Sequence, residues 1–331
     1  MGQWRQSKKE KQEKEARKVK NRLWKQRRQT GDDLEGLNGR HRDYYRIQLP
    51  KVGKEYAKMM SVFARELPMS LRVSRLAPEW VRRSAVKIFE STLGKDISMH
   101  RLFKGSDNDW RAGVSNKVAS ETASRRLRDF LQRETQIGHI VRQEFVSMLP
   151  ARFLDVQAGD SVLDLCAAPG NKTQQLLEYT GPSGCVVGND ADVKRIEIIQ
   201  RRLGPHPQLV LTRALAEDLC KVKGLRFDRI LCDVPCTGDG TFRKCPHLWR
   251  MFRPRTAVEI HPLQLRIATS GLLMLDDSPG CRLVYSTCSL NPIENEAVVS
   301  ALLQTKIPQL RGRVRLVDVR DDIARVAPGL K

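Results

Sequence analysis

The chain has 331 residues, of which 40% are hydrophobic and 29% charged, a composition that excludes collagen-like, fully disordered and disulfide-scaffold proteins. No stretch approaches the roughly 18 consecutive apolar residues of a membrane-spanning helix, and no cysteines lie at zinc-ligand spacing. We therefore expect no membrane segment and no metal site. The formal net charge of +21 is typical of proteins that bind nucleic acid, although a basic enzyme of another kind can also carry it.

The first 30 residues are strongly basic, with twelve Lys and Arg against three Glu, a net charge of 12 − 3 = +9. They hold too few apolar side chains for a core. We predict a helix-prone arm that contacts phosphates, while a solvated tail fits the composition equally well. With the Gly-rich stretch 31–39, this arm and its linker are assigned residues 1–40. The arm favours a nuclear or cytoplasmic location, with a mitochondrial address as the alternative.

Residues 41–150 form a mixed segment rich in Lys and Arg, which we interpret as a small auxiliary domain that handles the substrate. Near its end, apolar residues recur at spacings of three and four. The spacing predicts one face of a single helix that Pro150 ends. The apolar residues of this face are Ile137, Ile140, Val141, Phe145, Met148 and Leu149.

From residue 151 to 331, short β-branched runs alternate with amphipathic segments. This alternation predicts a doubly wound, Rossmann-like α/β fold, with a parallel sheet covered by helices on both faces. Ligands bind such sheets at the carboxyl ends of the strands. The predicted strands are 161–166, 185–190, 208–212, 227–233 and 282–287, and the clearest helices are 193–203 and 263–275.

The first of these strands leads into a loop of small residues, DLCAAPGNKT at 164–173, and a helix is predicted from near Gln174. Small residues let the backbone approach a ligand, and the helix amino end offers free N–H donors. Asp190 ends the second strand, where a carboxylate can bind ribose hydroxyls. Because the G-x-G-x-x-G phosphate motif is missing, S-adenosylmethionine is favoured over a dinucleotide. A tight turn with a surface aspartate is the alternative.

Two cysteines follow the ends of the fourth and fifth strands. Cys236 comes shortly after Asp233, and Cys288 follows the strand 282–287. Each alone would more often be an inert buried side chain, but adjacent strand ends should bring the three residues together. A thiolate that adds to C6 of a pyrimidine makes C5 nucleophilic enough to accept a methyl group. We assign Cys288 as the nucleophile, Asp233 as the group that engages N3 and Cys236 as the helper in release.

These segments resemble the NSUN (Nop/Sun) family of RNA cytosine-C5 methyltransferases and are nearest to its eukaryotic tRNA-modifying subgroup. The similarity covers DLCAAPGNKT (164–173), DVPCTGDGTFRK (233–244) and VYSTCSLNPIENEAV (284–298), with further matches at 67–73 and 130–150. The resemblance implies Cys288 as nucleophile, Cys236 as the releasing residue, and a smaller α+β RNA-binding domain that includes Arg72 and a helix with Arg142, Gln143 and Glu144. It implies S-adenosylmethionine binding by Cys166, Ala167, Ala168, Pro169, Gly170, Asn171, Lys172, Asp190 and Asp233.

The sequence departs from the family pattern in two places. Ala214 stands where the family usually has an aspartate for the cofactor adenine, and Glu217 or Asp218 could substitute for it. A sixth strand is predicted at 314–319 without the final strand that completes the family's sheet. Because this would leave an open sheet edge, we expect that the sequence is a fragment, that the lineage trimmed the strand, or that a protein partner covers the edge.

The leading hypothesis is an S-adenosylmethionine-dependent RNA cytosine-C5 methyltransferase that acts on tRNA, with rRNA as the alternative substrate. The rival is a catalytically inactive RNA-binding scaffold, such as a ribosome-assembly factor. Ala214 and the missing strand favour the scaffold, whereas the thiol pair and the intact cofactor loop favour the enzyme.

Overall fold

The computed structural model describes residues 39–48, 55–92, 97–103, 106, 108–245 and 247–320. The predicted basic arm lies outside these residues. The chain divides into two compact units, each made of several segments. The smaller unit comprises Met1–Leu67, Cys236–Pro262 and Thr287–Val298, and the larger unit comprises Pro68–Pro235, Leu263–Ser286 and Val299–Lys331. The division into three consecutive domains, with a boundary at residue 150, stays a prediction.

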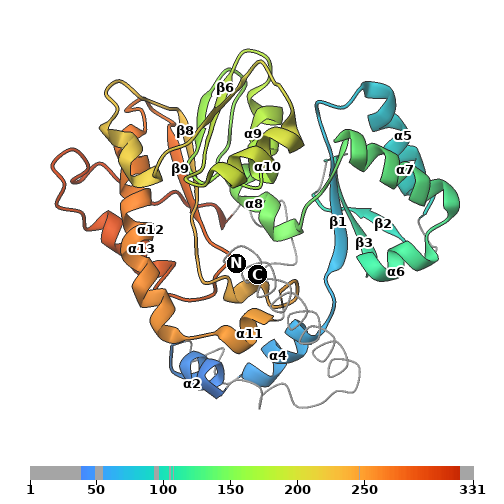
Figure 1. Ribbon diagram of the computed structural model, residues 1–331, viewed down its shortest axis with the longest axis horizontal. Coiled ribbons are helices and arrows are strands. Elements are labelled where there is room, and N and C mark those ends of the chain that lie inside the picture. The colour runs from blue at the N-terminus through green and yellow to red at the C-terminus, as the bar shows by residue number, and fades with distance from the viewer. Residues whose placement is uncertain are drawn as a thin grey trace, which may run out of the picture. The chain divides into compact units, whose positions relative to one another are not determined.

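The larger unit contains the predicted parallel sheet (Figure 1). Its strand order is β7-β6-β5-β8-β9, and all neighbours run parallel. Strands β6 and β7 lie on one side of β5, and β8 and β9 lie on the other side. The carboxyl end of β5 is therefore a switch point, where such folds bind ligands. The α/β fold class is confirmed. The strands are β5 (Ser161–Asp164), β6 (Cys185–Asn189), β7 (Leu209–Thr212), β8 (Arg229–Asp233) and β9 (Arg282–Ser286).

Helices cover both faces of this sheet because side chains alternate along each strand. On one face, Val162 and Leu231 pack with Leu176 of helix α9 (Asn171–Thr180). On the other face, Leu163 and Ile230 share a cluster with Ile267, which lies in helix α12 (Pro254–Met274). Helix α10 (Val193–Leu203) has the predicted bounds, and the 3-10 helix η2 (Ala216–Lys221) follows β7.

A second, antiparallel sheet lies in the same unit, in the order β2-β3-β1-β4. Helices α5 and α7 lie side by side (Figure 1), and the Phe89 and Phe130 rings contact each other within the core of this sheet. Ser124 caps helix α7 by accepting a hydrogen bond from the Leu127 N–H. The elements are β1 (Pro68–Val73), β2 (Met99–Arg101), β3 (Asp109–Ser115), β4 (Ile140–Arg142), α5 (Glu79–Glu90), α6 (Asn116–Thr122) and α7 (Arg125–Ile137).

The single helix predicted across 137–149 is wrong. Helix α7 ends at Gly138, whose φ of 87° is the left-handed conformation that terminates helices. Ile140 and Val141 then pair with β1 as part of β4, so their apolar spacing reflects a strand. Helix α8 (Phe145–Phe153) begins afterwards, and Pro150 lies inside it rather than at its end.

The sixth strand predicted at 314–319 is also wrong, because this segment forms no ladder with any described strand. An extended segment without a partner gains no backbone hydrogen bonds. Accordingly Leu316 is 69% exposed, so its apolar pattern does not mark a buried strand. Among the described strands, β9 is one edge of the parallel sheet, and helix α13 (Glu296–Leu303) follows it in the chain.

The smaller unit is built around aromatic side chains from distant parts of the chain. It contains α2 (Gly39–Gln48), α4 (Tyr56–Ala64), the 3-10 helix η3 (Asp239–Thr241) and α11 (His247–Met251). The fully buried His41 contacts the Trp249 ring at a centroid distance of 4.4 Å, and burial lowers the pKa of His41 to about 3. Within the described ranges, no helix has the length and apolarity needed to span a bilayer.

Candidate active site

The loop after β5 is shaped for close approach to a ligand. Helix α9 begins at Asn171, three residues earlier than predicted. Gly170 precedes it with φ of 95°, and a Cβ there would lie 3.3 Å from Ile199, so both conformation and space favour glycine. The Thr173 hydroxyl donates to Asp164 Oδ2 at 2.8 Å. This contact joins the end of β5 to the first turn of the helix.

Three carboxylates surround this loop. Asp164, Asp190 and Asp233 all act electrostatically on the Cys166 thiol, whose pKa is raised mainly by burial. Burial also raises the pKa of Asp164 to about 7. Asp190 is buried, and its Oδ2 lies 3.4 Å from the Ala168 N–H and 3.4 Å from Arg195. The Cys166 thiol therefore stays protonated.

Asn171 Oδ1, near this loop, is buried and accepts no hydrogen bond from the described residues, whereas the Asp164 carboxylate accepts from the Thr173 hydroxyl and the Cys166 backbone N–H. Buried acceptors without partners are costly, so they point to donors supplied by a bound molecule. Asn171 Oδ1 and the Asp190 carboxylate suit the hydroxyl and ammonium groups of a nucleoside-like ligand. The predicted cofactor loop thus has the donor and acceptor chemistry that S-adenosylmethionine requires.

Asp233 lies at the end of β8 and is paired with Lys172. The Lys172 ammonium donates to Asp233 Oδ2 at 2.7 Å and to Ser147 Oγ at 3.0 Å. The Ser286 hydroxyl donates to the other Asp233 oxygen at 2.7 Å, and Ser286 is the β9 residue opposite Asp233 in the sheet. The structure therefore brings two predicted cofactor residues together, with both carboxylate oxygens acting as acceptors.

Asn189 was missed by the sequence analysis. It is fully buried at the end of β6, and its side-chain amide makes four hydrogen bonds. Nδ2 donates to the carbonyl oxygens of Leu165 and Ala214 at 3.1 and 3.0 Å, and Oδ1 accepts from Thr212 Oγ1 and Ala214 N–H at 3.0 Å each. Asn189 therefore ties together the loops that follow β5 and β7. Its position beside Asp190 was the only signal in the sequence.

Ala214 thus contributes its backbone N–H and carbonyl to the hydrogen bonds of Asn189, but it offers no carboxylate to a cofactor. The two residues suggested as substitutes already have partners in the structure. Glu217 lies 3.8 Å from Arg266, and Asp218 lies 2.6 Å from Lys221. Neither side chain is therefore an unpaired acceptor that could replace the aspartate missing at position 214.

The two predicted cysteines lie together in the smaller unit. Their sulfur atoms are 3.1 Å apart, and the Cys288 N–H donates to Cys236 Sγ at 3.3 Å. Gly240 N–H donates to the Cys288 carbonyl at 3.0 Å, and a Cβ at Gly240 would lie 2.7 Å from that oxygen. The two loops can approach this closely because residue 240 is glycine. Asp233 belongs to the larger unit, and its predicted place beside the thiols stays a prediction.

The two thiols differ in exposure and proton affinity. Cys288 is exposed, whereas Cys236 is half-buried. The hydrogen bond between the two thiols and burial together raise the pKa of Cys236. Cys236 therefore keeps its proton and can donate it toward the Cys288 sulfur, which leaves Cys288 as the better placed nucleophile. Within the described ranges, no group of three His, Cys, Asp or Glu residues is arranged to hold a metal ion.

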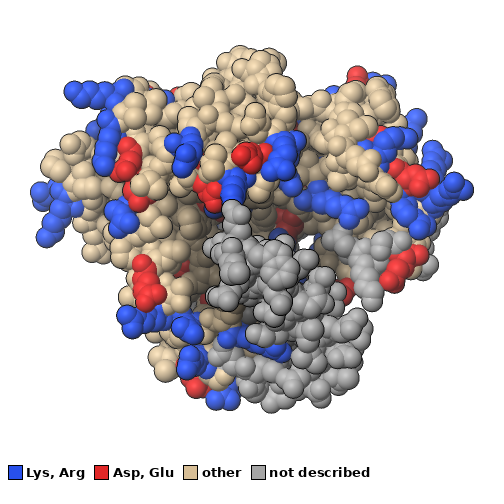
Figure 2. Space-filling view, viewed as in Figure 1, with Lys and Arg blue, Asp and Glu red and all other residues tan. Residues whose placement is uncertain are grey.

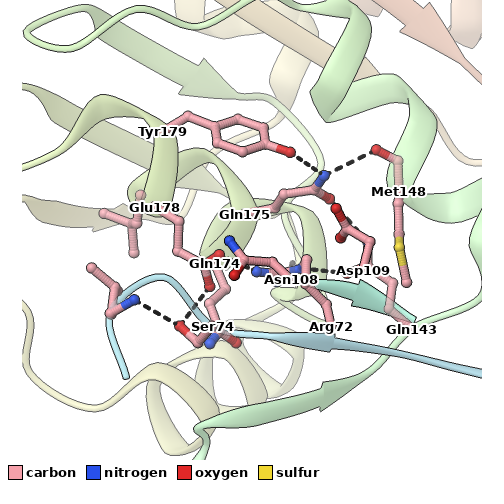
Figure 3. A network of polar contacts seen from close by, with 12 residues as sticks. Arg72, Ser74, Asn108, Asp109, Gln143, Met148, Gln174, Gln175, Glu178 and Tyr179 are labelled. Carbon is pink, nitrogen blue, oxygen red and sulfur yellow. Dashed lines mark hydrogen bonds and ion pairs between the residues drawn. The ribbon is translucent and has the colours of Figure 1, made fainter. Parts of the chain in front are cut away.

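Arg72 and Gln143, which the resemblance placed in an RNA-binding region, instead join the small sheet to helix α9 (Figure 3). Arg72 is 2% exposed and pairs with the buried Glu178, while its Nε donates to Gln143 Oε1 at 3.3 Å. Gln143 also donates to Gln175 Oε1 at 3.2 Å, and Ser74 Oγ donates to Glu178 at 2.7 Å. Arg72 is therefore unavailable to RNA. The helix expected at 142–144 is wrong as well, because Arg142 ends strand β4.

Comparison with known proteins assigns the chain to a family. A family model described as 16S rRNA methyltransferase RsmB/F matches residues 151–320, which is more than half of the chain. The multisite-specific tRNA:(cytosine-C(5))-methyltransferase trm4b of Schizosaccharomyces pombe is 45% identical over 231 residues, covering 59% of this chain and 33% of that protein. The tRNA (cytosine(34)-C(5))-methyltransferase of Drosophila melanogaster is 44% identical over 225 residues, covering 62% of this chain and 29% of its own length. The chain thus spans about a third of the length of these curated relatives.

Solved structures show the same fold. A methyltransferase homologue from Pyrococcus horikoshii is 28% identical with a TM-score of 0.59, covering 76% of this chain and 75% of its own. The structure of NSun6 from the same organism has a TM-score of 0.61 at 20% identity, covering 82% and 88%, and supports the fold alone. These matches confirm the resemblance drawn from the motifs. The chain belongs to the RsmB/F family of methyltransferases.

Proposed function

We propose that this chain carries an S-adenosylmethionine-dependent RNA cytosine-C5 methyltransferase activity, with tRNA as the substrate. The observation that carries the proposal is the cysteine pair, with sulfur atoms 3.1 Å apart, on loops that follow two neighbouring parallel strands. The choice of tRNA rests on relatives that are 40–45% identical and are named as tRNA cytosine-C5 methyltransferases. Relatives named as rRNA enzymes are less similar, at 32–36% identity.

S-adenosylmethionine, when bound, supplies an electrophilic methyl group. Asp190 is placed at the strand end where a carboxylate accepts from ribose hydroxyls. The unpartnered Oδ1 of Asn171 is a further acceptor for its polar groups. The backbone of residues 166–170 forms the wall of the site, since small residues there leave the main chain open to close approach.

The Cys288 thiolate adds to C6 of the target cytosine, and the S–C6 bond forms as the C5–C6 π electrons shift into the ring toward N3. We assign engagement of N3 to the Lys172–Asp233 pair, because Lys172 is the proton-bearing neighbour of that carboxylate. C5 then takes the methyl group. Removal of the C5 proton re-forms the C5–C6 double bond and expels the Cys288 thiolate, a release step that Cys236 assists.

The surface charge supports an RNA substrate. Lys and Arg side chains are spread over the face of the molecule seen in Figure 2 and outnumber Asp and Glu there. Such side chains neutralise phosphates without reading sequence. Exposed basic residues include Lys194, Arg195, Arg201 and Arg202 on α10, and Arg125, Arg126 and Arg128 on α7.

Asp190→Asn should weaken S-adenosylmethionine binding roughly 10- to 150-fold, because a hydrogen bond to a charged group contributes about 1.5–3 kcal/mol. Isothermal titration calorimetry of the protein with S-adenosylmethionine measures this directly. Asp129→Asn, at an exposed position on α7, is the matched control and should bind as wild type. Equal affinity of the Asp190 and Asp129 variants would remove Asp190 from the site. Absence of binding to the wild-type protein would favour the inactive RNA-binding scaffold.

A further inference from the structure

We infer that Glu294 is a positioning residue, which holds the two cysteine loops against each other so that both thiols can act on one base. The role of the thiols in this inference rests on the proposed function, whereas the hydrogen bonds of Glu294 do not depend on it. Glu294 is fully buried in the smaller unit. It precedes helix α13 and lies in the motif 284–298, where only Cys288 was assigned a role from the sequence.

The Glu294 carboxylate holds the first cysteine loop through both of its oxygens. Thr237, the residue directly after Cys236, donates its backbone N–H to Glu294 Oε2 at 2.9 Å and its hydroxyl to Oε1 at 2.5 Å. The carboxylate therefore fixes both the main chain and the side chain next to the first thiol.

The same carboxylate holds the second loop through Ser289, the residue directly after Cys288. Ser289 Oγ donates to Glu294 Oε1 at 2.7 Å and lies 2.9 Å from Asp239 Oδ1. Asp239 also accepts from the Leu290 N–H at 2.7 Å. Glu294 thus bonds to the residue that follows each cysteine, across 57 residues of sequence on one side and five on the other.

The arrangement favours a carboxylate over an amide. Three donors converge on two acceptor oxygens, and hydrogen bonds to an ionised acceptor are stronger than neutral ones. Glutamine has the same shape but only one acceptor oxygen. If its oxygen accepts from the Thr237 N–H, its NH₂ group can only donate to the two hydroxyl oxygens, so both hydroxyls must turn their protons elsewhere and the charge-assisted bonds become neutral ones. Glu294 also acts electrostatically on Cys236, which places its charge near the thiol pair.

The test compares Glu294→Gln with Glu296→Gln, an exposed position two residues further along the chain. Each protein is treated with diamide, which takes two electrons and two protons from a thiol pair and leaves a disulfide. The rate of Cys236–Cys288 crosslinking is followed by peptide mapping. We expect Glu294→Gln to crosslink roughly tenfold more slowly, the order set by one charge-assisted hydrogen bond. Glu296→Gln should match wild type.

Two further measurements separate positioning from folding and from activity. S-adenosylmethionine affinity, a property of the larger unit, should stay unchanged in Glu294→Gln, while kcat for methyl transfer falls. Thr237→Val is close in shape and removes the hydroxyl that contacts Glu294 and, at 3.3 Å, Ser289. It tests the same set of contacts should Glu294→Gln fail to fold, and its crosslinking should slow as well. Wild-type crosslinking rates in folded Glu294→Gln or Thr237→Val would overturn the inference. Methyl transfer absent from the wild-type protein would overturn the proposed function and leave the crosslinking result intact.

Discussion

Cys288→Ala should abolish methyl transfer from labelled S-adenosylmethionine to tRNA, with a loss of at least about a thousandfold, as expected when a covalent nucleophile is removed. The reason is chemical, because C5 of cytosine does not attack the methyl donor until a nucleophile has added to C6. The exposed Cys288 is the thiol placed for that addition. Cys281→Ala is the matched control, since Cys281 is a free, partly exposed cysteine that lies in the larger unit. Its activity should stay at the wild-type level.

Cys236→Ala should have a different outcome, in which RNA accumulates on the protein as a covalent adduct. Addition and methylation proceed through Cys288, but release stalls because the assisting thiol is missing. Denaturing electrophoresis of the protein after incubation with tRNA and S-adenosylmethionine shows the adduct as a slower band that nuclease removes. The double variant Cys236→Ala/Cys288→Ala should show no such band. Methyl transfer that survives in Cys288→Ala, or an adduct that forms without Cys288, would contradict the assignment of the two roles.

The parallel sheet could be predicted because buried strands carry their signal locally. Each of the five strands is a short β-branched run, and each predicted range contains the observed strand with at most two extra residues at either end. The segment around Ile140 could not be assigned in this way. Its apolar spacing fits a helix, and only the left-handed Gly138 together with pairing to β1 makes it a strand. The same limit applies to 314–319, where extended propensity alone gives no ladder.

The site could be predicted only in part, because several of its residues are placed by contacts with distant parts of the sequence. The cysteines converge because β8 and β9 are neighbours, which follows from the rules of parallel sheets. Glu294 and Asn189 could not be found, since a polar residue is usually exposed and its burial depends on donors far away in the sequence. Arg72 shows the reverse error. The family resemblance placed Arg72 in an RNA-binding domain, yet burial and the Glu178 carboxylate determine the contacts of this side chain.

That carboxylate, Glu178, is buried together with the guanidinium group that it pairs with. The side chains of Arg72 and Glu178 are 2% and 1% exposed, so each charge is removed from water and depends on the other. Glu178 also accepts from Ser74, and its helix carries Gln175, which is bonded to Gln143 and to the Met148 carbonyl (Figure 3). The helix that starts at the cofactor loop is therefore held to the small sheet by polar contacts that have no access to solvent.

Glu178→Ala should lower the free energy of unfolding by about 3–5 kcal/mol, because it leaves the Arg72 guanidinium buried without its counter-charge. Urea denaturation followed by circular dichroism measures the loss. Glu79→Ala is the control, since it breaks the exposed pair with Arg83 and should change stability by less than about 1 kcal/mol. The double variant Arg72→Met/Glu178→Met replaces both charges with apolar groups and should recover most of the loss, with tRNA affinity unchanged. Equal stability of the Glu178 and Glu79 variants, or weaker tRNA binding by the double variant, would return Arg72 to the RNA-binding surface.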